Sequence, residues 1–385
     1  MTFSTSSCRC RSDLVRLQTL AAQHFRNLQD FRIVPHPRFN ILIGYNAQGK
    51  TNLLEAIYLS ANLKSFRTHQ NEELVRFGLQ EARVVAEVQR GNDTLTLELK
   101  LQTRRRLVWV DGQLTRRLTD ALGLLQVILF APEDVALIKG QPSARRSFLD
   151  HAVFVSRASY LSILSDYNAT LKRRNAVLKN DRRDAKLLEV YSEQLVEHGA
   201  EVIGARLELL RQLRPLFNDA FRNIFGAKLE ASIRYRASWA DQVDLDAPPD
   251  ANTLRCAMLA AIRALGGDEL RRKQSLVGPH RDDLEVLLDG TPAKAHASQG
   301  QHRSIVLALK CAEILLLKDR FGLEPILLLD DVSSELDSTR NQQLFSFLAS
   351  LSGQVFITTT AREHILLDQD QSAWTVHQGG LTPAD

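Results

Sequence analysis

Gly44-Tyr45-Asn46-Ala47-Gln48-Gly49-Lys50-Thr51 has the spacing of a phosphate-binding P-loop: a glycine, four variable residues, then Gly-Lys-Thr. The apolar run Ile41-Leu42-Ile43 precedes it and a helix-forming segment, 52–58, follows it, which is the strand–loop–helix context that such a loop requires. Backbone N–H groups and the positive end of the helix dipole bind phosphate there. The stretch therefore predicts a nucleoside triphosphate site, in which Lys50 reaches the β- and γ-phosphates and Thr51 binds Mg²⁺.

An acidic motif follows a second apolar run. Ile326-Leu327-Leu328-Leu329 is typical of a buried strand, and Asp330-Asp331 follows it directly, which is a Walker B pattern. Ligands of α/β sheets bind at the carboxyl ends of the strands. We expect Asp330 to hold Mg²⁺ and Asp331 to orient the attacking water as a general base, so Lys50 and Asp331 are the predicted catalytic residues.

A third motif, Ser298-Gln299-Gly300-Gln301, precedes a helical stretch at 305–317. A P-loop, a long insert, Ser-x-Gly-Gln and then Walker B is the order found in ABC-type ATPases. In those enzymes the serine contacts the γ-phosphate that a second subunit's P-loop holds. The order predicts an α/β fold: an ABC-type P-loop ATPase head of mixed sheets and helices, with an inserted helical lid subdomain.

The rest of the chain divides around these motifs. We expect a disordered extension at 1–13, a split head at 14–142 and 276–385, and a helical lid at 143–275. In the head, alternating patterns predict paired strands in 17–31 and strands at 84–88, 94–99, 107–110 and 127–130, with a hairpin turn at Asp111-Gly112. In the lid, β-branched runs give way to helical periodicity, interrupted near Pro248, and strands resume from Leu284.

The composition limits the classes of protein to which the chain can belong. The 385 residues carry a formal net charge of +4 and four cysteines, too few and too dispersed for a disulfide framework. No run approaches the roughly 18 apolar residues of a membrane span. A cytoplasmic protein with no membrane partner is expected.

Six segments together resemble the RecF family of bacterial recombination-repair ATPases. They occur in the family's order, at 46–58 (NAQGKTNLLEAIY), 65–67 (SFR), 130–134 (FAPED), 278–283 (GPHRDD), 298–301 (SQGQ) and 330–337 (DDVSSELD). The resemblance implies binding of ATP and Mg²⁺, an ATP-dependent homodimer on double-stranded or gapped DNA, and help for RecO and RecR in loading recombinase at gaps. Hydrolysis is expected to be weak, DNA-dependent and used as a switch.

The resemblance also assigns residues. It makes Ser334 to Asp337 a D-loop that reaches across the dimer, and puts Glu133 near the glutamine loop of relatives. Asp331 stands where many ABC enzymes have glutamate, which implies slow turnover. Thr359 or Thr360 falls near the usual switch histidine, and Ser333 stands where a bulky apolar residue is expected.

DNA contacts are expected from basic clusters, because neutralising phosphates requires several cations on one surface. The main candidates are Arg104, Arg105, Arg106, Arg116 and Arg117; other clusters are at 172–174, 182–183 and 271–273. Two alternatives stay open. An SMC-like chromosome organiser would need long heptad arms, and a transporter's nucleotide subunit would not have about 250 residues between P-loop and signature.

Overall fold

The computed structural model describes residues 15–157, 159–180, 184–226, 228–240, 243–247, 249–322, 324–367 and 370–384. The expected disordered extension, 1–13, lies outside them. The chain forms two compact units, one of Met1–Glu133 with Ile314–Asp385 and one of Asp134–Glu313. The second unit begins earlier and ends later than the lid expected at 143–275. How the chain divides into head and lid stays a prediction.

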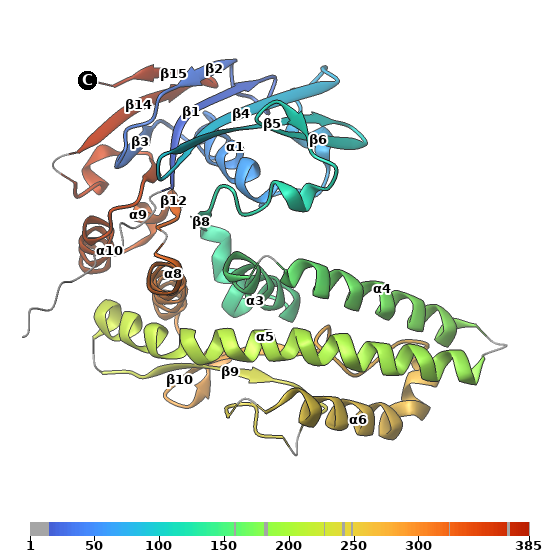
Figure 1. The fold of residues 1–385 in the computed structure, drawn as a ribbon. Helices are drawn as coiled ribbons and strands as arrows, with labels where there is room; N and C mark the ends of the chain where they lie inside the picture. Colours follow the sequence, from blue (N-terminus) through green and yellow to red (C-terminus); the bar gives the residue numbers. More distant parts are fainter. Residues whose placement is uncertain are drawn as a thin grey trace, which may run out of the picture. The chain divides into compact units, whose positions relative to one another are not determined.

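The first unit contains a six-stranded antiparallel sheet in the order β2-β1-β4-β5-β6-β7 (Figure 1). Its strands are β1 (Val15–Gln23), β2 (Phe31–Ile33), β4 (Glu81–Arg90), β5 (Asp93–Gln102), β6 (Arg105–Val110) and β7 (Gln113–Leu114). The strands expected at 84–88, 94–99 and 107–110 are confirmed, whereas the pair expected within 17–31 is β1 with β2, and β2 begins only at Phe31. Asp111 and Gly112 join β6 to β7 with φ angles of 50° and 76°, the paired positive values that a tight hairpin turn needs.

The second sheet of this unit carries the P-loop. Its order is β15-β14-β3-β13-β12-β8, and all neighbours except β14 and β15 run parallel. The strands are β3 (Phe39–Ile43), β8 (Val127–Phe130), β12 (Ile326–Asp330), β13 (Val355–Thr359), β14 (Gln371–His377) and β15 (Gly380–Pro383). Because β3, β13 and β12 are parallel neighbours, the P-loop after β3 and Asp330 at the end of β12 share one edge of the sheet.

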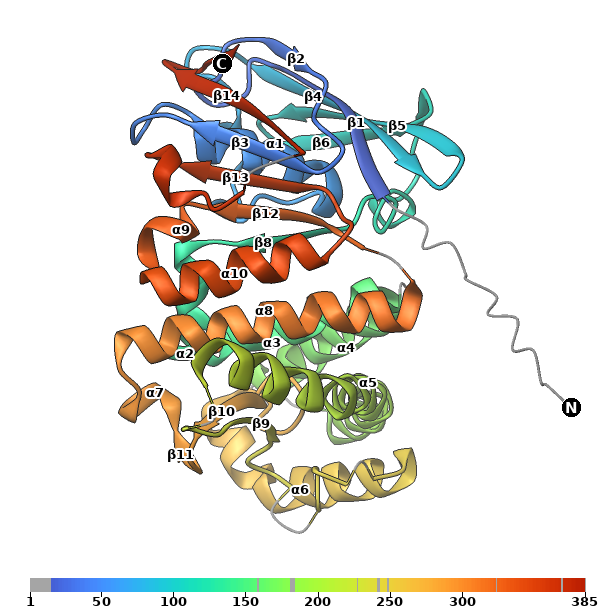
Figure 2. The same ribbon diagram turned by 90° about the vertical axis from the view of Figure 1, so that its left-hand side faces the viewer.

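Helix α1 (Lys50–Asn62) lies between these two sheets (Figure 2). Leu53, Leu54, Ala56 and Ile57 are fully buried in one core with residues of both sheets. These apolar residues bury the middle of α1, while its first turn, which begins at Lys50, continues the P-loop. The unit's other short elements are η1 (Asn71–Leu74), η2 (Leu118–Asp120), α9 (Val332–Glu335), α10 (Ser338–Ser350) and η4 (Arg362–His364), and η3 (Pro132–Val135) spans the boundary.

The second unit is mainly helical. It contains α2 (Ala136–Lys139), α3 (Pro142–Ser156), α4 (Tyr160–Lys179), α5 (Ala185–Phe225), α6 (Ala251–Arg272), α7 (Ala293–His296) and the first part of α8 (Gln299–Phe321). Helix α5 packs against α4, α6, α3 and β9 (Figure 1). It runs for 41 residues through Pro215.

One strand was missed in this unit. β9 (Ala231–Arg236) lies in the stretch expected to be helical, and it pairs with β10 (Asp283–Leu288), which pairs in turn with β11 (Thr291–Pro292). The strand that resumes near Leu284 therefore joins a three-stranded sheet in the second unit and not a sheet of the first. The signal was present in β9, where Ile233 and Tyr235 are buried and Arg234 and Arg236 are exposed.

Candidate nucleotide-binding site

The P-loop has a backbone that its glycines make possible. Ala47 and Gly49 have φ angles of 64° and 116°. A Cβ atom on Gly49 would lie 2.9 Å from Leu28 Cδ2, and one on Gly44 would lie 2.4 Å from the carbonyl oxygen of Val376. Gly49 therefore suits a backbone conformation that other residues rarely adopt, and Gly44 is required by its close approach to the backbone of β14.

Lys50 begins α1 and is buried. Its Nζ donates hydrogen bonds to the carbonyl oxygens of Gly44, at 2.6 Å, and Tyr45, at 3.0 Å, so the ammonium group is held inside the loop. Burial lowers the pKa of Lys50, while the charges of Asp331 and Asp330 act in the opposite direction. The site thus combines one compact cation with two nearby carboxylates.

Asp330 and Thr51 meet across the two motifs, 279 residues apart in the sequence. The Thr51 hydroxyl donates to Asp330 Oδ1 at 2.9 Å, and the Thr358 hydroxyl donates to the same oxygen at 2.8 Å. Burial raises the pKa of Asp330, and both hydroxyl hydrogen bonds counter that rise. The charge of Glu133 also raises the pKa of Asp330, which places Glu133 near the motif.

Asp331 has a left-handed backbone, with φ 50° and ψ 26°, and precedes α9. Its N–H donates to Thr358 Oγ1 at 2.9 Å. Its Oδ1 is buried and accepts no hydrogen bond from any described residue. A strained residue with an unpartnered buried acceptor is the kind of feature that clusters at functional sites.

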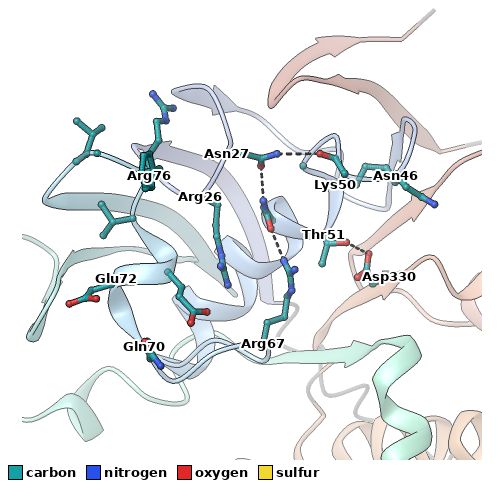
Figure 3. Close-up of a pocket in the computed structure, with 18 of the residues that line it drawn as sticks. Arg26, Asn27, Asn46, Lys50, Thr51, Arg67, Gln70, Glu72, Arg76 and Asp330 are labelled. Atoms are coloured by element: carbon teal, nitrogen blue, oxygen red, sulfur yellow. Dashed lines mark hydrogen bonds between the residues drawn. The ribbon is translucent and has the colours of Figure 1, made fainter.

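A cleft of about 1150 Å³ opens beside these residues. Asn46, Ala47, Gly49, Lys50, Thr51, Asp330 and Asp331 line one part of it, and Pro132 adds to the wall. Arg26, Asn27 and Arg67 line it further along, before Gln70, Glu72 and the segment 75–79 (Figure 3). The volume is somewhat above the roughly 300–1,000 Å³ that is usual for ligand pockets, so the cleft has room for a nucleotide.

Three predicted P-loop residues do not line the cleft. Tyr45 is 80% exposed, Gly44 packs against β14, and Gln48 faces the β14–β15 turn, where its carbonyl oxygen accepts a hydrogen bond from Gly379 N–H. These residues shape the loop from outside.

The signature motif, Ser298-Gln299-Gly300-Gln301, belongs to the second unit. Ser298 and Gln301 form a capping box at the start of α8: Gln301 Oε1 accepts from the Ser298 N–H at 2.6 Å, and Ser298 Oγ accepts from the Gln301 N–H at 3.3 Å. Ser298 and Gln299 are exposed and Gly300 is half-buried. The motif is an ordered helix start with an accessible serine.

The predicted D-loop follows Asp331. Ser334 is exposed and its hydroxyl donates to the Asp331 carbonyl oxygen at 2.8 Å, while Asp337 caps α10 by accepting from Arg340 N–H at 2.9 Å. Ser333 is buried, and its hydroxyl has no hydrogen-bond partner among the described residues. A small residue thus occupies the position where a bulky apolar one was expected.

The predicted DNA contacts differ in exposure. Arg104, Arg105, Arg116 and Arg117 are exposed near the ends of β5, β6 and β7. Arg106 is half-buried and donates to Asn71 Oδ1 at 2.6 Å, and its burial lowers its pKa. Of the other clusters, Arg182 and Arg183 lie outside the described residues. The prediction that Arg174 is a surface cation is wrong, because Arg174 is buried and forms an ion pair with Glu269 at 2.6 Å.

Sequence reasoning missed four side chains at the site: Arg26, Asn27, Glu55 and Thr358. Arg26 and Asn27 stand in a loop between β1 and β2 with no motif to mark them. Glu55 is inside the recognised α1 segment, but nothing in the sequence says that it faces arginines. Thr358 stands one residue before the threonines expected at the switch position.

Two features are absent from the described part of the chain. No helix there is both long and apolar enough to cross a membrane. Among the same residues, no group of three or more His, Cys, Asp and Glu side chains could hold a metal ion.

The chain is similar to known proteins over most of its length. A family model described as the RecF/RecN/SMC N terminal domain matches residues 16–381. "DNA replication and repair protein RecF" of Geotalea daltonii is 40% identical over 355 residues, 92% of this chain and 96% of that protein. The protein of the same name from Streptococcus uberis is 38% identical over 367 residues, 95% of this chain and 99% of that protein.

Solved structures agree. One titled "Structure of the recombination mediator protein RecF-ATP in RecFOR pathway" has a TM-score of 0.88 and 31% identity, and covers 97% of this chain and 100% of that chain. An Smc head domain from Pyrococcus furiosus, 15% identical with a TM-score of 0.57 over 96% of both chains, shares the fold alone. The predicted fold class, an ABC-type ATPase head with an inserted helical subdomain, is confirmed.

Proposed function

The chain belongs to the RecF family of DNA replication and repair proteins, and from that premise we propose that it is an ATP-gated, DNA-binding dimer. ATP binds in the cleft of the first unit, and its γ-phosphate joins two copies of the chain. The single observation that carries the proposal is the meeting of Thr51 and Asp330, whose oxygens lie 2.9 Å apart at the end of the P-loop.

That distance fits Mg²⁺. An octahedral Mg²⁺ with bonds of 2.0–2.1 Å has neighbouring ligand oxygens about 2.9 Å apart. A hydroxyl and a carboxylate are the hard oxygen donors that the ion prefers, and Mg²⁺ is usually held by one or two protein oxygens together with substrate phosphates. Thr51 and Asp330 would hold the ion, which neutralises charge on the β- and γ-phosphates.

Lys50 and Asp331 have different roles in ATP hydrolysis. The Lys50 ammonium, already directed into the loop, supplies positive charge to the β- and γ-phosphates. Asp331 Oδ1, a buried acceptor with no described partner, orients the attacking water and accepts its proton. An aspartate reaches less far than a glutamate, so turnover is slow and hydrolysis serves to reset a switch.

The dimer places Ser298 of one copy at the γ-phosphate held by the other. Ser298 is exposed and begins α8, and the start of a helix carries the positive end of its dipole. Ser334, whose hydroxyl donates to the Asp331 carbonyl oxygen, and Asp337 complete the shared surface. Because the γ-phosphate is the shared ligand, ATP favours the dimer and ADP does not.

DNA binds through phosphate contacts. The four exposed arginines Arg104, Arg105, Arg116 and Arg117 stand near neighbouring strand ends of one sheet, where several cations can act on one duplex. Double-stranded DNA next to a gap is the proposed substrate. The RecFOR pathway named for a similar structure makes RecO and RecR the proposed partners, in the loading of recombinase.

Mass measurement by light scattering, with ATP, with ADP and with gapped DNA added, tests the proposal. The wild type should dimerise with ATP alone, and Ser298→Arg should bind ATP as a monomer. Mixing Ser298→Arg with Lys50→Arg protein should partly restore the dimer, because one composite site then has an intact P-loop and an intact serine. A Ser298→Arg protein that dimerises with ATP like the wild type would refute the shared site.

A further inference from the structure

Glu55 lies on α1, five residues after Lys50, and its side chain is completely buried. Arg26 donates to it through two nitrogens, Nε to Oε2 at 2.9 Å and Nη2 to Oε1 at 2.8 Å. The Ser65 hydroxyl donates to Oε1 at 2.5 Å, and Arg67 Nη1 lies 3.8 Å from Oε2. One carboxylate on α1 therefore holds groups from two other segments of the first unit, the loop with Arg26 and the turn with Ser65 and Arg67.

A buried carboxylate is costly unless its charge is paired and its oxygens are hydrogen-bonded. The bidentate fork from Arg26 meets both needs, and it also fixes the plane of the guanidinium group. The Ser65 hydroxyl extends this order, because it accepts hydrogen bonds from the N–H groups of Arg67, at 2.9 Å, and Thr68, at 3.0 Å. Glu55 thus fixes the turn that carries Arg67.

Arg67 is tied to the P-loop as well. Its Nη1 donates to Asn52 Oδ1 at 2.8 Å, Asn52 Nδ2 donates to Asn27 Oδ1 at 2.6 Å, and Asn27 Nδ2 donates to the Ala47 carbonyl oxygen at 3.3 Å (Figure 3). In the view of Figure 3, Arg26 and Arg67 stand between Thr51 on one side and Gln70 on the other. The two guanidinium groups therefore border the cleft next to the first turn of α1.

We propose that Glu55 is a positioning residue for the nucleotide, which holds Arg26 and Arg67 in the orientation that binds the phosphates common to ATP and ADP. The inference rests on the proposed function and adds a second cationic wall to the site, apart from Lys50. Both arginines line the cleft while Glu55, being buried, does not touch it. Glu55 acts through the arginines alone.

The direction in which nucleotide affinity changes in Glu55→Gln distinguishes a positioning role from a purely electrostatic one. Glu55→Gln removes one negative charge beside a site for a polyanion, so Coulomb attraction alone predicts tighter nucleotide binding. If Glu55 positions the arginines, the same variant binds more weakly, because its neutral amide no longer holds two guanidinium groups in place. Loss of one or two charge-assisted hydrogen bonds to phosphate corresponds to about ten- to hundred-fold in affinity.

Isothermal titration of the full chain with Mg-ATP and with Mg-ADP measures the affinity for each nucleotide. We expect Glu55→Gln to weaken both by at least about tenfold and to the same extent. Glu98→Gln is the matched control: it breaks a similar bidentate pair with Arg83, at 2.7 and 2.9 Å, that lies away from the cleft. The control should bind both nucleotides like the wild type.

A double-mutant cycle excludes a merely structural role. In a background with Arg26→Ala and Arg67→Ala, Glu55→Gln should cause no further loss of affinity. Should Glu55→Gln fail to fold, Arg26→Lys and Arg67→Lys keep the charges but not the fork, and each should weaken both nucleotides.

Unchanged or tighter binding by Glu55→Gln, a loss confined to ATP, or a further loss in the arginine-free background would each overturn the proposal. Where Glu55→Gln does not fold, undiminished binding by both lysine variants would do so. A wild-type chain that binds no ATP would instead refute the proposed function.

Discussion

The backbone N–H of Gly379 donates a hydrogen bond of 2.9 Å to the carbonyl oxygen of Gln48, in the middle of the P-loop. The Gln48 side chain completes the contact, since its Oε1 accepts from the Gln378 N–H at 2.7 Å. The turn between β14 and β15 thus supports the P-loop from behind. A Cβ atom on Gly379 would lie 2.0 Å from the Asn27 carbonyl oxygen, so only glycine fits there.

Gly379→Ala should therefore weaken nucleotide binding by about tenfold, because the added methyl group displaces either the turn or the Asn27 loop that also contacts the P-loop. Gly112→Ala is the control. Gly112 has the same φ of 76° in another hairpin turn of the unit, but a Cβ there meets nothing within 4 Å. Titration with ATP compares the two, and equal effects would show that only backbone strain matters.

Thr358→Val should slow ATP hydrolysis and shift the acid side of its pH profile to higher pH. The Thr358 hydroxyl hydrogen bond holds the pKa of Asp330 down against burial, so removing it raises that pKa and Asp330 protonates earlier as the pH falls. Single-turnover rates between pH 5 and 9 measure the shift. Thr358→Ser keeps the hydroxyl and should keep the wild-type profile; a valine variant with that same profile would contradict the prediction.

A buried carboxyl group in the second unit makes stability depend on pH. Asp282 accepts from Tyr235 OH at 2.7 Å and from Trp239 Nε1 at 2.8 Å, and burial raises its pKa to about 7 despite these hydrogen bonds and the charges of Arg206 and Arg146. The folded state holds this proton more tightly than the unfolded state. The contribution to stability is complete below about pH 4 and is lost as the pH rises through about 7.

His280, on the same turn, works in the opposite sense. Burial lowers its pKa to about 4, so its contribution to stability is present above about pH 6.5 and is lost as the pH falls through about 4. Between about pH 4 and 6.5 the contributions of Asp282 and His280 to the free energy of unfolding change with pH in opposite directions and offset each other. In the Asp282→Asn variant only the His280 contribution remains. The unfolding free energy of this variant should therefore rise with pH between about pH 4 and 6.5 relative to wild type, by at most about 1.4 kcal/mol per pH unit.

Urea unfolding at pH 4.5 to 7 tests this difference. The double variant Asp282→Asn with His280→Gln serves as the control and should lose the added slope. A constant difference between Asp282→Asn and the wild type would show that Asp282 ionises normally in the folded protein.

Arg174 and Arg173 are neighbours in sequence with opposite roles. Arg174 is buried and donates to Glu269 Oε2, to the Ser192 hydroxyl and to the Ser275 hydroxyl, whereas Arg173 is exposed. Arg174→Ala leaves a buried carboxylate unpaired and should cost about 3–5 kcal/mol of unfolding free energy, while Arg173→Ala should cost less than about 0.5 kcal/mol. Denaturant midpoints measure both, and similar values would contradict the assignment.

The sequence by itself determined the parts of this protein that depend on short stretches of chain. A P-loop binds phosphate with consecutive backbone N–H groups, so its residues must be contiguous, and its strand and helix flank it directly. The Asp330-Asp331 pair, the Ser298 helix start and the hairpin at Asp111-Gly112 are local in the same way. Their order along the chain was enough to predict the fold class and the family.

Only the tertiary structure decided which distant side chains meet them. Arg26 reaches Glu55 across 29 residues, and Gly379 reaches Gln48 across more than three hundred, because β14 pairs with β3 in the parallel sheet. Alternation in β9 was readable, but its partner β10, some fifty residues away, was not. Burial likewise separated Arg174 from Arg173. Such contacts depend on strand order and on which helix face is covered, and long-range packing sets both.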